Sequence, residues 1–341
     1  MHLSSIFKGV NVGIDLGTKN FLVYIKGIGV VVNEPAVVAI DKKTRSLLAI
    51  GEDAQKMLGR TPSSIVAVRP FKGGVIADYD LAQQMIQGFM YRLRSYVGFF
   101  KPNVLVGVPW GITEVEKRAI IEAMKQSGVK NTSLIYEPLA AAIGSDLSVF
   151  EAKGMMLLDI GGGTTEVSVM SLGGICLCKS IRVAGDDFDE AIIQHCRRSY
   201  NLLVGERMAE TVKIQIGSAF PLKEEKNMQI SGRDLMSGLP KTFTISSYEI
   251  RDALAEGCLS IIGAVKLALE QTPPELSSDV MSSGIYLTGG GSLLAGLNKY
   301  ISQDIGLDVR TVSDAMGAVA VGTGHILDAN MIVKHMSIVC K

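Results

Sequence analysis

The chain has 341 residues, of which 47% are hydrophobic, so it can bury a large core and exceeds the usual size of one domain. Its 34 basic and 34 acidic side chains balance, which argues against nucleic acid as a partner, because binding to phosphate backbones needs an excess of lysine and arginine. No apolar run reaches the roughly 18 residues that cross a bilayer, and the N-terminus lacks the apolar region of a secretory signal. We therefore expect a cytoplasmic protein that does not span a membrane.

Short β-branched runs alternate with amphipathic stretches along the chain, a pattern typical of α/β proteins. The first two strands are predicted at residues 12–16 and 21–25, joined by a tight polar turn. A third is predicted at 103–108, before a helix that Thr113 and Glu116 begin as a capping box. Later strands are predicted at 155–160, 166–171 and 285–288, and the chain from Leu293 onward has a helical pattern.

The five cysteines indicate reduced thiols. Their number is odd, and the one close pair, Cys176 and Cys178, is a C-x-C on a predicted strand and not the C-x-x-C of zinc or redox sites.

Two segments of the chain repeat one local pattern. Gly13-Ile14-Asp15-Leu16-Gly17-Thr18 and Leu158-Asp159-Ile160-Gly161-Gly162-Gly163-Thr164 both run from an apolar strand through aspartate, glycine and threonine into a second strand. The two aspartates stand 144 residues apart, which is too far for a solenoid repeat and suits two copies of one domain. The repeat predicts two duplicated lobes with a cleft between them.

Each repeated turn has the chemistry of a phosphate-binding loop. Glycines let successive backbone N–H groups approach an anion, because no Cβ intervenes and φ can be positive. Thr18 and Thr164 add hydroxyl donors, and Asp15 and Asp159 are suited to hold the water shell of Mg²⁺. Either turn alone could be an ordinary β-turn, but two of the same design favour phosphate binding. Neither matches the G-x-x-x-x-G-K-[ST] loop or the Rossmann glycine motif.

Two further clusters are weaker signals by themselves. Gly289-Gly290-Gly291-Ser292 lies between a predicted strand and a helix, where close backbone approach suits an adenine or a ribose phosphate. Glu210 and Lys213 are one helical turn apart, so both can face one side of a cleft, although a solvated surface ion pair explains them equally simply.

The three glycine clusters, in this order and spacing, resemble the superfamily of actin, sugar kinases and the seventy-kilodalton heat-shock chaperones. Within it, the chain is most similar to the MreB family of bacterial actin-like proteins, over about residues 10–328. The matching segments are Asp15-Leu16-Gly17-Thr18, Val32-Asn33-Glu34-Pro35, Gly73-Gly74-Val75-Ile76-Ala77-Asp78, Glu137-Pro138-Leu139-Ala140-Ala141-Ala142-Ile143-Gly144, Asp159-Ile160-Gly161-Gly162-Gly163-Thr164-Thr165-Glu166-Val167, Thr272-Pro273-Pro274-Glu275-Leu276 and Leu287-Thr288-Gly289-Gly290-Gly291.

The resemblance implies roles for individual residues. Glu137 would position the water that attacks the γ-phosphate, with Thr164 as its helper and Asp159 beside them; the alternative for Glu137 is a carboxylate that stabilises a helix start. Asp15 and Asp159 would hold Mg²⁺ through water. The residues implied to bind ATP or GTP are Asp15, Gly17, Thr18, Lys19, Asn20, Gly161, Gly162, Gly163, Thr164, Gly185, Glu210, Thr211, Val212, Lys213, Gly289, Gly290, Gly291 and Ser292.

Two positions depart from the family pattern. Lys19 replaces a small residue in the first phosphate loop, which leaves open either an added phosphate contact or slower product release. Tyr136 stands where an acid usually precedes the Glu-Pro pair. We therefore expect slow, Mg²⁺-dependent ATP hydrolysis.

Two segments are candidates for membrane contact. Leu3, Ile6 and Phe7 recur on one face of a short N-terminal helix, for which a frayed terminus is the alternative. Phe99 and Phe100 match a membrane-insertion loop of the family, with local packing as the alternative; Arg92, Arg94 and Lys101 are near enough to favour an anionic leaflet.

The resemblance implies an α/β, actin-like fold of two duplicated lobes around a nucleotide cleft, each lobe with a small insert. The expected divisions are 1–38, 72–151 and 321–341 for lobe I, 39–71 for its insert, 152–187 and 252–320 for lobe II, and 188–251 for its insert. The implied function is an ATPase that forms homopolymer filaments on the inner face of the cell membrane, with membrane proteins of cell-shape and wall synthesis as partners. The alternatives are a non-polymerising small-molecule kinase and a chaperone-type ATPase.

Overall fold

The computed structural model describes residues 10–98, 101–328 and 338–340, and the chain divides into two compact units. Unit 1 comprises residues 1–153, 170–176 and 316–341, and unit 2 comprises residues 154–169 and 177–315. Among the described residues, no helix is both long enough and apolar enough to cross a bilayer. The four-part division expected from the sequence stays a prediction.

Unit 1 is built on a six-stranded sheet in the order β19-β10-β9-β1-β2-β3. Its middle strands β1, β9 and β10 are parallel, while β2, β3 and β19 run antiparallel to their neighbours. The parallel strands therefore all begin at one edge of the sheet and end at the other. The strands are β1 (Asn11–Leu16), β2 (Asn20–Ile25), β3 (Gly29–Pro35), β9 (Asn103–Val108), β10 (Asn131–Tyr136) and β19 (Ile338–Cys340).

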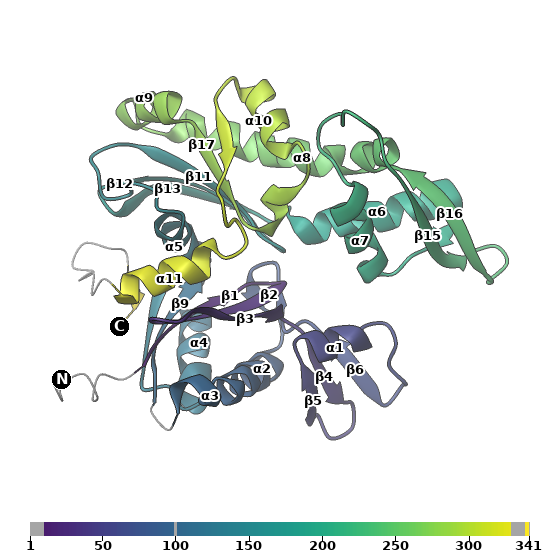
Figure 1. The fold of residues 1–341 in the computed structure, drawn as a ribbon, viewed down its shortest axis with the longest axis horizontal. Helices are drawn as coiled ribbons and strands as arrows, with labels where there is room; N and C mark the ends of the chain where they lie inside the picture. The colour runs from purple at the N-terminus through teal and green to yellow at the C-terminus, as the bar shows by residue number, and fades with distance from the viewer. Residues whose placement is uncertain (1–9, 99–100, 329–337, 341) are drawn as a thin grey trace. The chain divides into compact units, whose positions relative to one another are not determined.

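Helices cover both faces of this sheet, as Figure 1 shows. On one face lie α2 (Tyr79–Arg92), α3 (Arg94–Val97) and α4 (Glu114–Gln126); α11 (Ala318–Asp328) and α5 (Glu137–Gly144) pack on the other. Alternate residues of a strand point to opposite faces. Accordingly, Val12 and Ile14 of β1 join the core under α2, whereas a Cβ added to Gly13 would lie 2.2 Å from Thr323 Oγ1 on α11.

A small three-stranded sheet follows β3 in unit 1. It consists of β4 (Val38–Asp41), β5 (Leu47–Ile50) and β6 (Ile65–Val68), in the order β5-β4-β6, with α1 (Glu52–Met57) packed on it. A two-stranded hairpin of β7 (Phe71–Lys72) and β8 (Val75–Ile76) then leads into α2.

Unit 2 has a five-stranded sheet in the order β13-β12-β11-β17-β18. All six residues of β11 are buried, as expected of a central strand that pairs in parallel with β17 and is covered on both faces. The strands are β11 (Met155–Ile160), β12 (Thr165–Ser171), β13 (Gly174–Ile181), β17 (Ile285–Thr288) and β18 (Val309–Thr311), and the nearby helices are α8 (Ser247–Gln271), α9 (Pro274–Ser283) and α10 (Leu297–Ile305).

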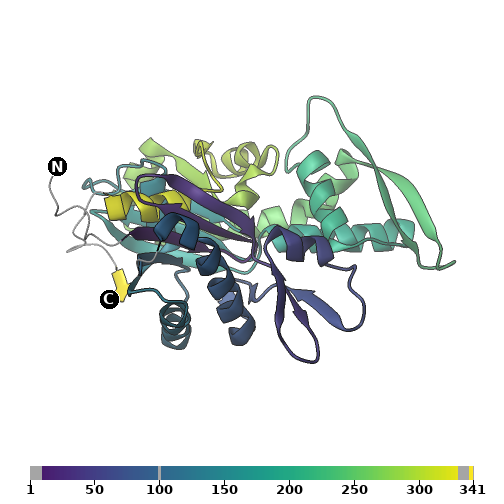
Figure 2. The same cartoon turned by 60° about the horizontal axis from the view of Figure 1, so that its bottom comes forward.

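The rest of unit 2 surrounds a three-stranded sheet, β14-β15-β16. Its strands are β14 (Leu202–Leu203), β15 (Asn227–Asp234) and β16 (Pro240–Ser246), flanked by α6 (Gly185–Tyr200) and α7 (Glu206–Ile216). The β15–β16 hairpin extends away from the helices of its unit in Figure 2. One hydrophobic core joins this part to the five-stranded sheet, since Ile230 and Ile245 cluster with residues of β11 and α8.

The strands predicted from the sequence are confirmed, as is the capping box of Thr113 and Glu116 at the start of α4. The helix predicted to begin at Leu293 begins later in the structure, so the predicted start is wrong. Residues Gly290–Leu293 form a single 3₁₀ turn, and α10 begins at Leu297 because Gly296 adopts the left-handed conformation (φ 74°) and interrupts the helical path. Four cysteines with described side chains, Cys176, Cys178, Cys196 and Cys258, are free thiols.

Candidate functional site

The first phosphate hairpin lies at the end of β1 in unit 1. Asp15 is 9% exposed, and the pairing of Leu16 with Phe21 closes the turn between β1 and β2. The side chain of Thr18 is also buried, and its Oγ1 accepts a hydrogen bond from the backbone N–H of Gly74 at 3.1 Å. Because that oxygen is the acceptor, the hydroxyl hydrogen of Thr18 is left to donate to a ligand oxygen.

The second hairpin lies at the end of β11 in unit 2 and has the same design. Asp159 is 9% exposed, and the N–H of Gly161 donates to the carbonyl of Thr164 at 2.9 Å to close the turn. The next residue, Thr165, is fully buried and donates from Oγ1 to the carbonyl of Val183 at 2.6 Å. The turn is thereby fixed to the segment that leads into α6.

The role of glycine in these turns differs from the expectation of a positive φ. Neither Gly17 nor Gly161 adopts the left-handed conformation. What excludes a side chain is close approach across the turn, since a Cβ on Gly17 would lie 2.9 Å from the carbonyl oxygen of Asn20, and one on Gly161 would lie 3.3 Å from that of Thr164. The glycines therefore allow tight turns with compact backbones.

Burial strongly affects the carboxyl group of Asp159. Desolvation raises its pKa from 3.8 to about 6, because the charged form loses its hydration in the interior. A nearby cation would favour the ionised form and so recover this cost. The predicted role of Asp159 in holding Mg²⁺ through water stays a prediction.

The third glycine cluster packs directly against the second hairpin. Gly289 has φ 79°, and a Cβ there would lie 2.4 Å from Asp159 Oδ1 and 2.4 Å from the carbonyl oxygen of Ile160. A Cβ on Gly291 would lie 2.4 Å from Ile160 Cγ2. Ser292 is 3% exposed and donates from Oγ to the carbonyl of Gly289 at 2.7 Å, so its hydroxyl holds the turn together.

The start of α6 is also joined to the second hairpin. The N–H groups of Gly185 and Asp186 donate to the carbonyls of Gly161 and Gly162 at 3.1 and 2.7 Å. These bonds satisfy N–H groups that a helix start leaves without partners in the helix. They place Gly185 beside the predicted phosphate turn.

Lys213 on α7 has a role that the sequence did not suggest. Its Nζ donates to the carbonyl of Gly185 at 2.8 Å and lies 2.7 Å from Asp189 Oδ1, and its side chain is only 14% exposed. The alternative of a solvated surface ion pair is therefore wrong for Lys213, because the ammonium group is held against the start of α6; its place beside a nucleotide stays a prediction. Glu210 and Thr211 lie on the same helix, whereas Val212 is 1% exposed and its side chain belongs to the core.

Glu137 begins α5 at the edge of the unit 1 sheet where the parallel strands end. Gly107 pairs with Asp15 across β1 and β9, and a Cβ on Gly107 would lie 3.4 Å from Glu137 Cγ and 2.8 Å from Val319 Cγ1. The missing side chain of Gly107 therefore lets Val319 and the side chain of Glu137 pack closely against β9. The sequence analysis missed this glycine, whose only signal was a small residue near the end of a buried strand.

Lys19 and Tyr136, the two residues that depart from the family pattern, lie in the first hairpin and directly before Glu137. The carbonyl of Lys19 accepts from the N–H of Ala36 at 2.7 Å, and Asn20 donates from Nδ2 to Asn33 Oδ1 at 3.2 Å, so both residues of the turn are anchored to the strand beside it. The ring of Tyr136 packs against Trp110, with centroids 4.6 Å apart. An aromatic pair thus stands where a second acid was expected.

Within each unit, the structure brings the predicted nucleotide residues together. Unit 1 holds Asp15, Gly17, Thr18, Lys19, Asn20 and Glu137; unit 2 holds Asp159, Gly161, Gly162, Gly163, Thr164, Gly185, Glu210, Thr211, Val212, Lys213, Gly289, Gly290, Gly291 and Ser292. Their assignment to a nucleotide stays a prediction.

A protein-family model described as MreB/Mbl protein matches residues 9–335 of the chain. The chain belongs to the MreB/Mbl family. Similar relatives include the cell shape-determining protein Mbl of Bacillus subtilis (strain 168), 46% identical over 93% of this chain and 96% of the relative. Another is the cell shape-determining protein MreB of Escherichia coli (strain K12), 48% identical over 94% of this chain and 95% of the relative.

Solved structures of MreB/Mbl-like proteins share the fold. MreB5 of Spiroplasma citri bound to ADP superposes with a TM-score of 0.91 at 38% identity, covering 95% of this chain and 98% of that one. The AMPPNP-bound form of MreB5 gives a TM-score of 0.89. The MamK double helical filament gives 0.80 at 21% identity, covering 94% of this chain and 99% of that one, and supports the fold alone. The actin-like fold expected from the sequence is confirmed.

The residues predicted to contact a membrane lie outside the described part of the chain; they are Leu3, Ile6, Phe7, Phe99 and Phe100. Of the three cations considered with them, Arg92 has another role. Its Nη1 donates to both carboxylate oxygens of Glu34 at 2.8 Å, so its charge is balanced within unit 1.

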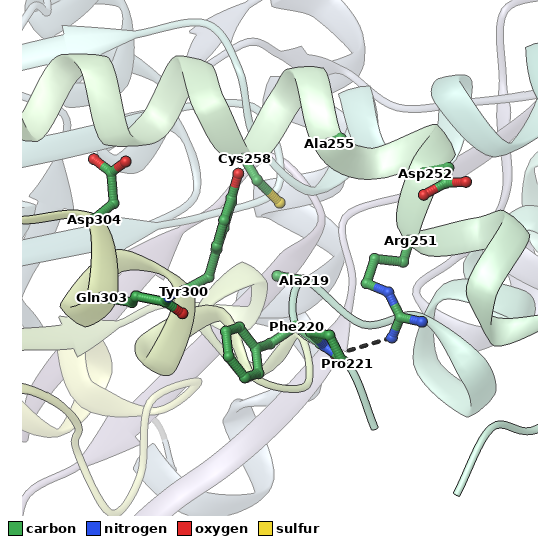
Figure 3. A pocket seen from close by; sticks show the side chains of 10 residues that line it. All are labelled: Ala219, Phe220, Pro221, Arg251, Asp252, Ala255, Cys258, Tyr300, Gln303 and Asp304. Atoms are coloured by element: carbon green, nitrogen blue, oxygen red, sulfur yellow. Dashed lines mark hydrogen bonds between the residues drawn. The ribbon is translucent and has the colours of Figure 1, made fainter. Parts of the chain in front are cut away.

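A cavity of about 410 Å³ lies elsewhere in unit 2, between α8 and α10. Figure 3 shows Arg251 at one end of it, donating to the carbonyl of Phe220 at 3.1 Å, with Gln303 and Asp304 at the other end. Arg251 also pairs with Glu225 at 2.5 Å. None of its lining residues is a predicted nucleotide residue, so the cavity is separate from the candidate site.

Proposed function

We propose that this chain binds and slowly hydrolyses ATP and assembles into filaments on the inner face of the cell membrane, where it acts in cell shape and wall synthesis. The carrying observation is the pair of hairpins, one in each unit, each with a buried aspartate at the strand end and a threonine in the turn. Relatives named as cell shape-determining proteins, and MreB5 structures bound to ADP and AMPPNP, support it.

The proposed chemistry needs few groups, because phosphoryl transfer depends mainly on positioning and charge stabilisation. Backbone N–H groups of the two turns, with the hydroxyls of Thr18 and Thr164, would grip the phosphate oxygens. Asp15 and Asp159 would hold Mg²⁺ through its water shell, and the ion would supply charge neutralisation of the phosphates. Glu137 would orient the attacking water from its place at the start of α5, beside Gly107.

The test of hydrolysis is a phosphate-release assay without any added acceptor. Glu137→Gln keeps the size of the side chain and removes the base, so the turnover rate should fall by about a hundredfold or more while AMPPNP affinity changes little. Gln126→Glu, on the exposed end of α4, is a control and should leave turnover unchanged. Phosphate release that requires a small-molecule acceptor would favour the kinase alternative, and unchanged turnover in Glu137→Gln would contradict the assigned role.

The preference for ATP is part of the proposal, with GTP as the competitor. Gly289 and Gly291 bring backbone without side chains close to Ile160 beside the second hairpin, and nothing in these contacts distinguishes adenine from guanine. Competition of ATP and GTP for one labelled nucleotide would measure the preference. Equal affinities for ATP and GTP would contradict ATP specificity but would not contradict the proposed phosphate site.

Filament formation is supported by family membership, and the proposed partner is a second copy of the chain. Sedimentation and electron microscopy with Mg²⁺ and ATP should show polymers. In parallel samples, polymers should be fewer with Mg²⁺ and ADP than with Mg²⁺ and AMPPNP. A protein that hydrolyses ATP but stays monomeric at all concentrations would support the chaperone-type alternative.

Membrane attachment is supported by where the two predicted anchor segments join the fold. The N–H of Asn103 donates to the carbonyl of Val10 at 3.0 Å, and Asn11 pairs with Asn103 in the parallel register of β1 and β9. The residue after the N-terminal segment and the residues after the Phe99-Phe100 segment therefore lie side by side at one sheet edge. Two weak anchors that start from one edge can bind a surface together.

The matching experiment is co-sedimentation with anionic liposomes. Deleting residues 2–9 and changing Phe99 and Phe100 to serine should release the protein, since each aliphatic or aromatic side chain contributes only about 1.5–3 kcal/mol. Leu48→Ser, an exposed leucine of the small sheet, is the control and should still sediment. Undiminished sedimentation of the combined variant would contradict membrane attachment through these segments.

A further inference from the structure

The edge of the unit 1 sheet where β1, β9 and β10 begin carries more than the two predicted anchors. Asn131 donates from Nδ2 to Asn103 Oδ1 at 2.9 Å, and Asn103 donates in turn to Asn11 Oδ1 at 3.2 Å. This chain of amide bonds fixes the starts of three parallel strands in line. Segments that are far apart in the sequence are thereby held at one edge.

The β2–β3 turn reaches the same edge, because β2 runs antiparallel to β1. The N–H of Lys26 donates to the carbonyl of Asn11 at 3.1 Å, and the chain then turns through Gly27, Ile28 and Gly29. Both glycines have positive φ, 79° and 103°, and a Cβ on either would meet no atom within 4 Å. The turn thus projects beyond the sheet, into open space.

The side chain at the tip of this turn is a large aliphatic group. Ile28 is 61% exposed, and Val30 on the following strand is 42% exposed. A turn with two glycines needs no apolar residue for its own stability, since glycine supplies the conformation and Ile28 is largely exposed among the described residues. An exposed isoleucine there costs solubility without stabilising the fold.

The fold also brings cations from different parts of the sequence together at this edge. The backbone N–H of Lys130 donates to the carbonyl of Pro102 at 2.8 Å, which places Lys130, an exposed residue, next to Lys101. On the helix side, the Arg94 guanidinium lies 5.0 Å from the ring centre of Tyr91, and Tyr91 and Tyr96 are 68% and 49% exposed. Tyrosines beside cations are typical of membrane–water interfaces.

The charge of the segments that form this edge differs from that of the whole chain. Near the starts of β9 and β10, residues 91–103 and 123–131 contain five lysines and arginines and no aspartate or glutamate, in a chain whose formal net charge is zero. Arg92 is balanced by Glu34, and Lys125 lies 3.9 Å from Glu122. Lys101 and Lys130, near the starts of β9 and β10, are both exposed, and their charges are suited to anionic headgroups.

We propose that this sheet edge is a bilayer-binding face in which Ile28 is a third lipid-inserting contact and Lys130 binds anionic headgroups. The inference rests on the proposed membrane attachment and adds residues that lie outside both anchor segments. A turn with an apolar tip would enter the acyl boundary, while Lys101, Lys130 and the two tyrosines would remain at headgroup level.

Insertion of the turn can be read from tryptophan fluorescence, because the chain has one tryptophan, Trp110, which follows β9 at the opposite sheet edge. In Ile28→Trp, vesicles with brominated acyl chains should quench an added component of emission, while the emission of the wild type should change little. Leu48→Trp, on the small sheet, is the matched control and should not be quenched. The open surroundings of the turn predict unchanged thermal unfolding for Ile28→Trp.

Partitioning onto vesicles gives the second measurement, made below the assembly concentration. Ile28→Ser should weaken partitioning by about five- to tenfold on any fluid bilayer, because part of the apolar surface of the isoleucine side chain would leave water on insertion. Lys130→Gln should weaken it on anionic vesicles and leave it unchanged on zwitterionic ones. Leu48→Ser should behave as the wild type.

The possible results distinguish the roles of Ile28 and Lys130 from the proposed membrane attachment on which they rest. A wild-type chain that fails to partition onto anionic vesicles would overturn both. Wild-type binding with an unquenched Ile28→Trp and an unweakened Ile28→Ser would overturn the role of the turn alone. Equal partitioning of Lys130→Gln and wild type on anionic vesicles would overturn the headgroup contact.

Discussion

The buried carboxyl group of Asp159 leads to a specific prediction about proton release on nucleotide binding. Desolvation raises its pKa to about 6 in the protein without ligand. Binding of Mg²⁺ through water favours the ionised form, so its pKa should fall when Mg·nucleotide binds. At pH 6 the group is about half protonated beforehand, and about half a proton should therefore be released from it on binding.

The magnitude follows from the size of the pKa shift. A rise from 3.8 to about 6 corresponds to about 3 kcal/mol, as an order of magnitude, for ionising the buried group. This carboxyl group binds its proton more tightly in the folded, ligand-free protein than in the unfolded chain. Its contribution to the free energy of unfolding is therefore present below about pH 4 and is lost as pH rises to about 6. Below pH 6, affinity for Mg·AMPPNP should fall by up to about tenfold per pH unit.

Calorimetric titration in buffers of different ionisation enthalpy measures the protons released. The phosphates of the nucleotide also titrate in this range, so the informative quantity is the difference between wild type and Asp159→Asn at each pH. We expect the difference to reach about half a proton at pH 6 and to vanish at pH 8. Equal release by the two proteins at pH 6, with both still binding nucleotide, would refute the link between this carboxyl group and the metal.

Three substitutions test the geometry of the two half-sites. Gly289→Ala places a Cβ 2.4 Å from the strand-end carboxylate and at positive φ, so nucleotide affinity should fall more than tenfold in a calorimetric titration; wild-type affinity would contradict the packing. Gly107→Ala should push Glu137 aside and lower the rate of phosphate release more than the affinity for AMPPNP, and an unchanged rate would exclude the positioning role. Lys213→Ala leaves Asp189 buried without its cation and should cost about 3–5 kcal/mol in urea unfolding, with Lys213→Arg as the conservative control; a cost near zero would show that the pair is exposed in solution.

The local patterns in the sequence were sufficient to predict the strands around both hairpins. A buried apolar run before an aspartate, followed by glycine and threonine, predicted β1 and β11 because central strands are apolar and tight turns need small residues. The start of α4 was equally local, since Thr113 and Glu116 satisfy the helix end by themselves. The actin-like arrangement of these parts came from the resemblance to a family.

Contacts between distant segments could not be predicted from the same patterns. The burial of Lys213 depends on Asp189, which lies on another helix, whereas its spacing from Glu210 left both a cleft position and a surface pair open. The helix start predicted at Leu293 was wrong because Leu294 is extended and Gly296 is left-handed, and neither conformation can be predicted from the helical pattern. Likewise, the neighbourhood of Lys130 and Pro102 depends on strand register, which the spacing of residues along the chain does not give.

The central claim is that both hairpins bind the phosphates of a single nucleotide, and a titration of Mg·AMPPNP into matched variants tests it most directly. Thr18→Ala and Thr164→Ala each remove one hydroxyl from one hairpin. We predict one nucleotide bound per chain in the wild type, with weaker affinity at that same site in each variant. Two independent sites, or wild-type affinity in either variant, would contradict the claim.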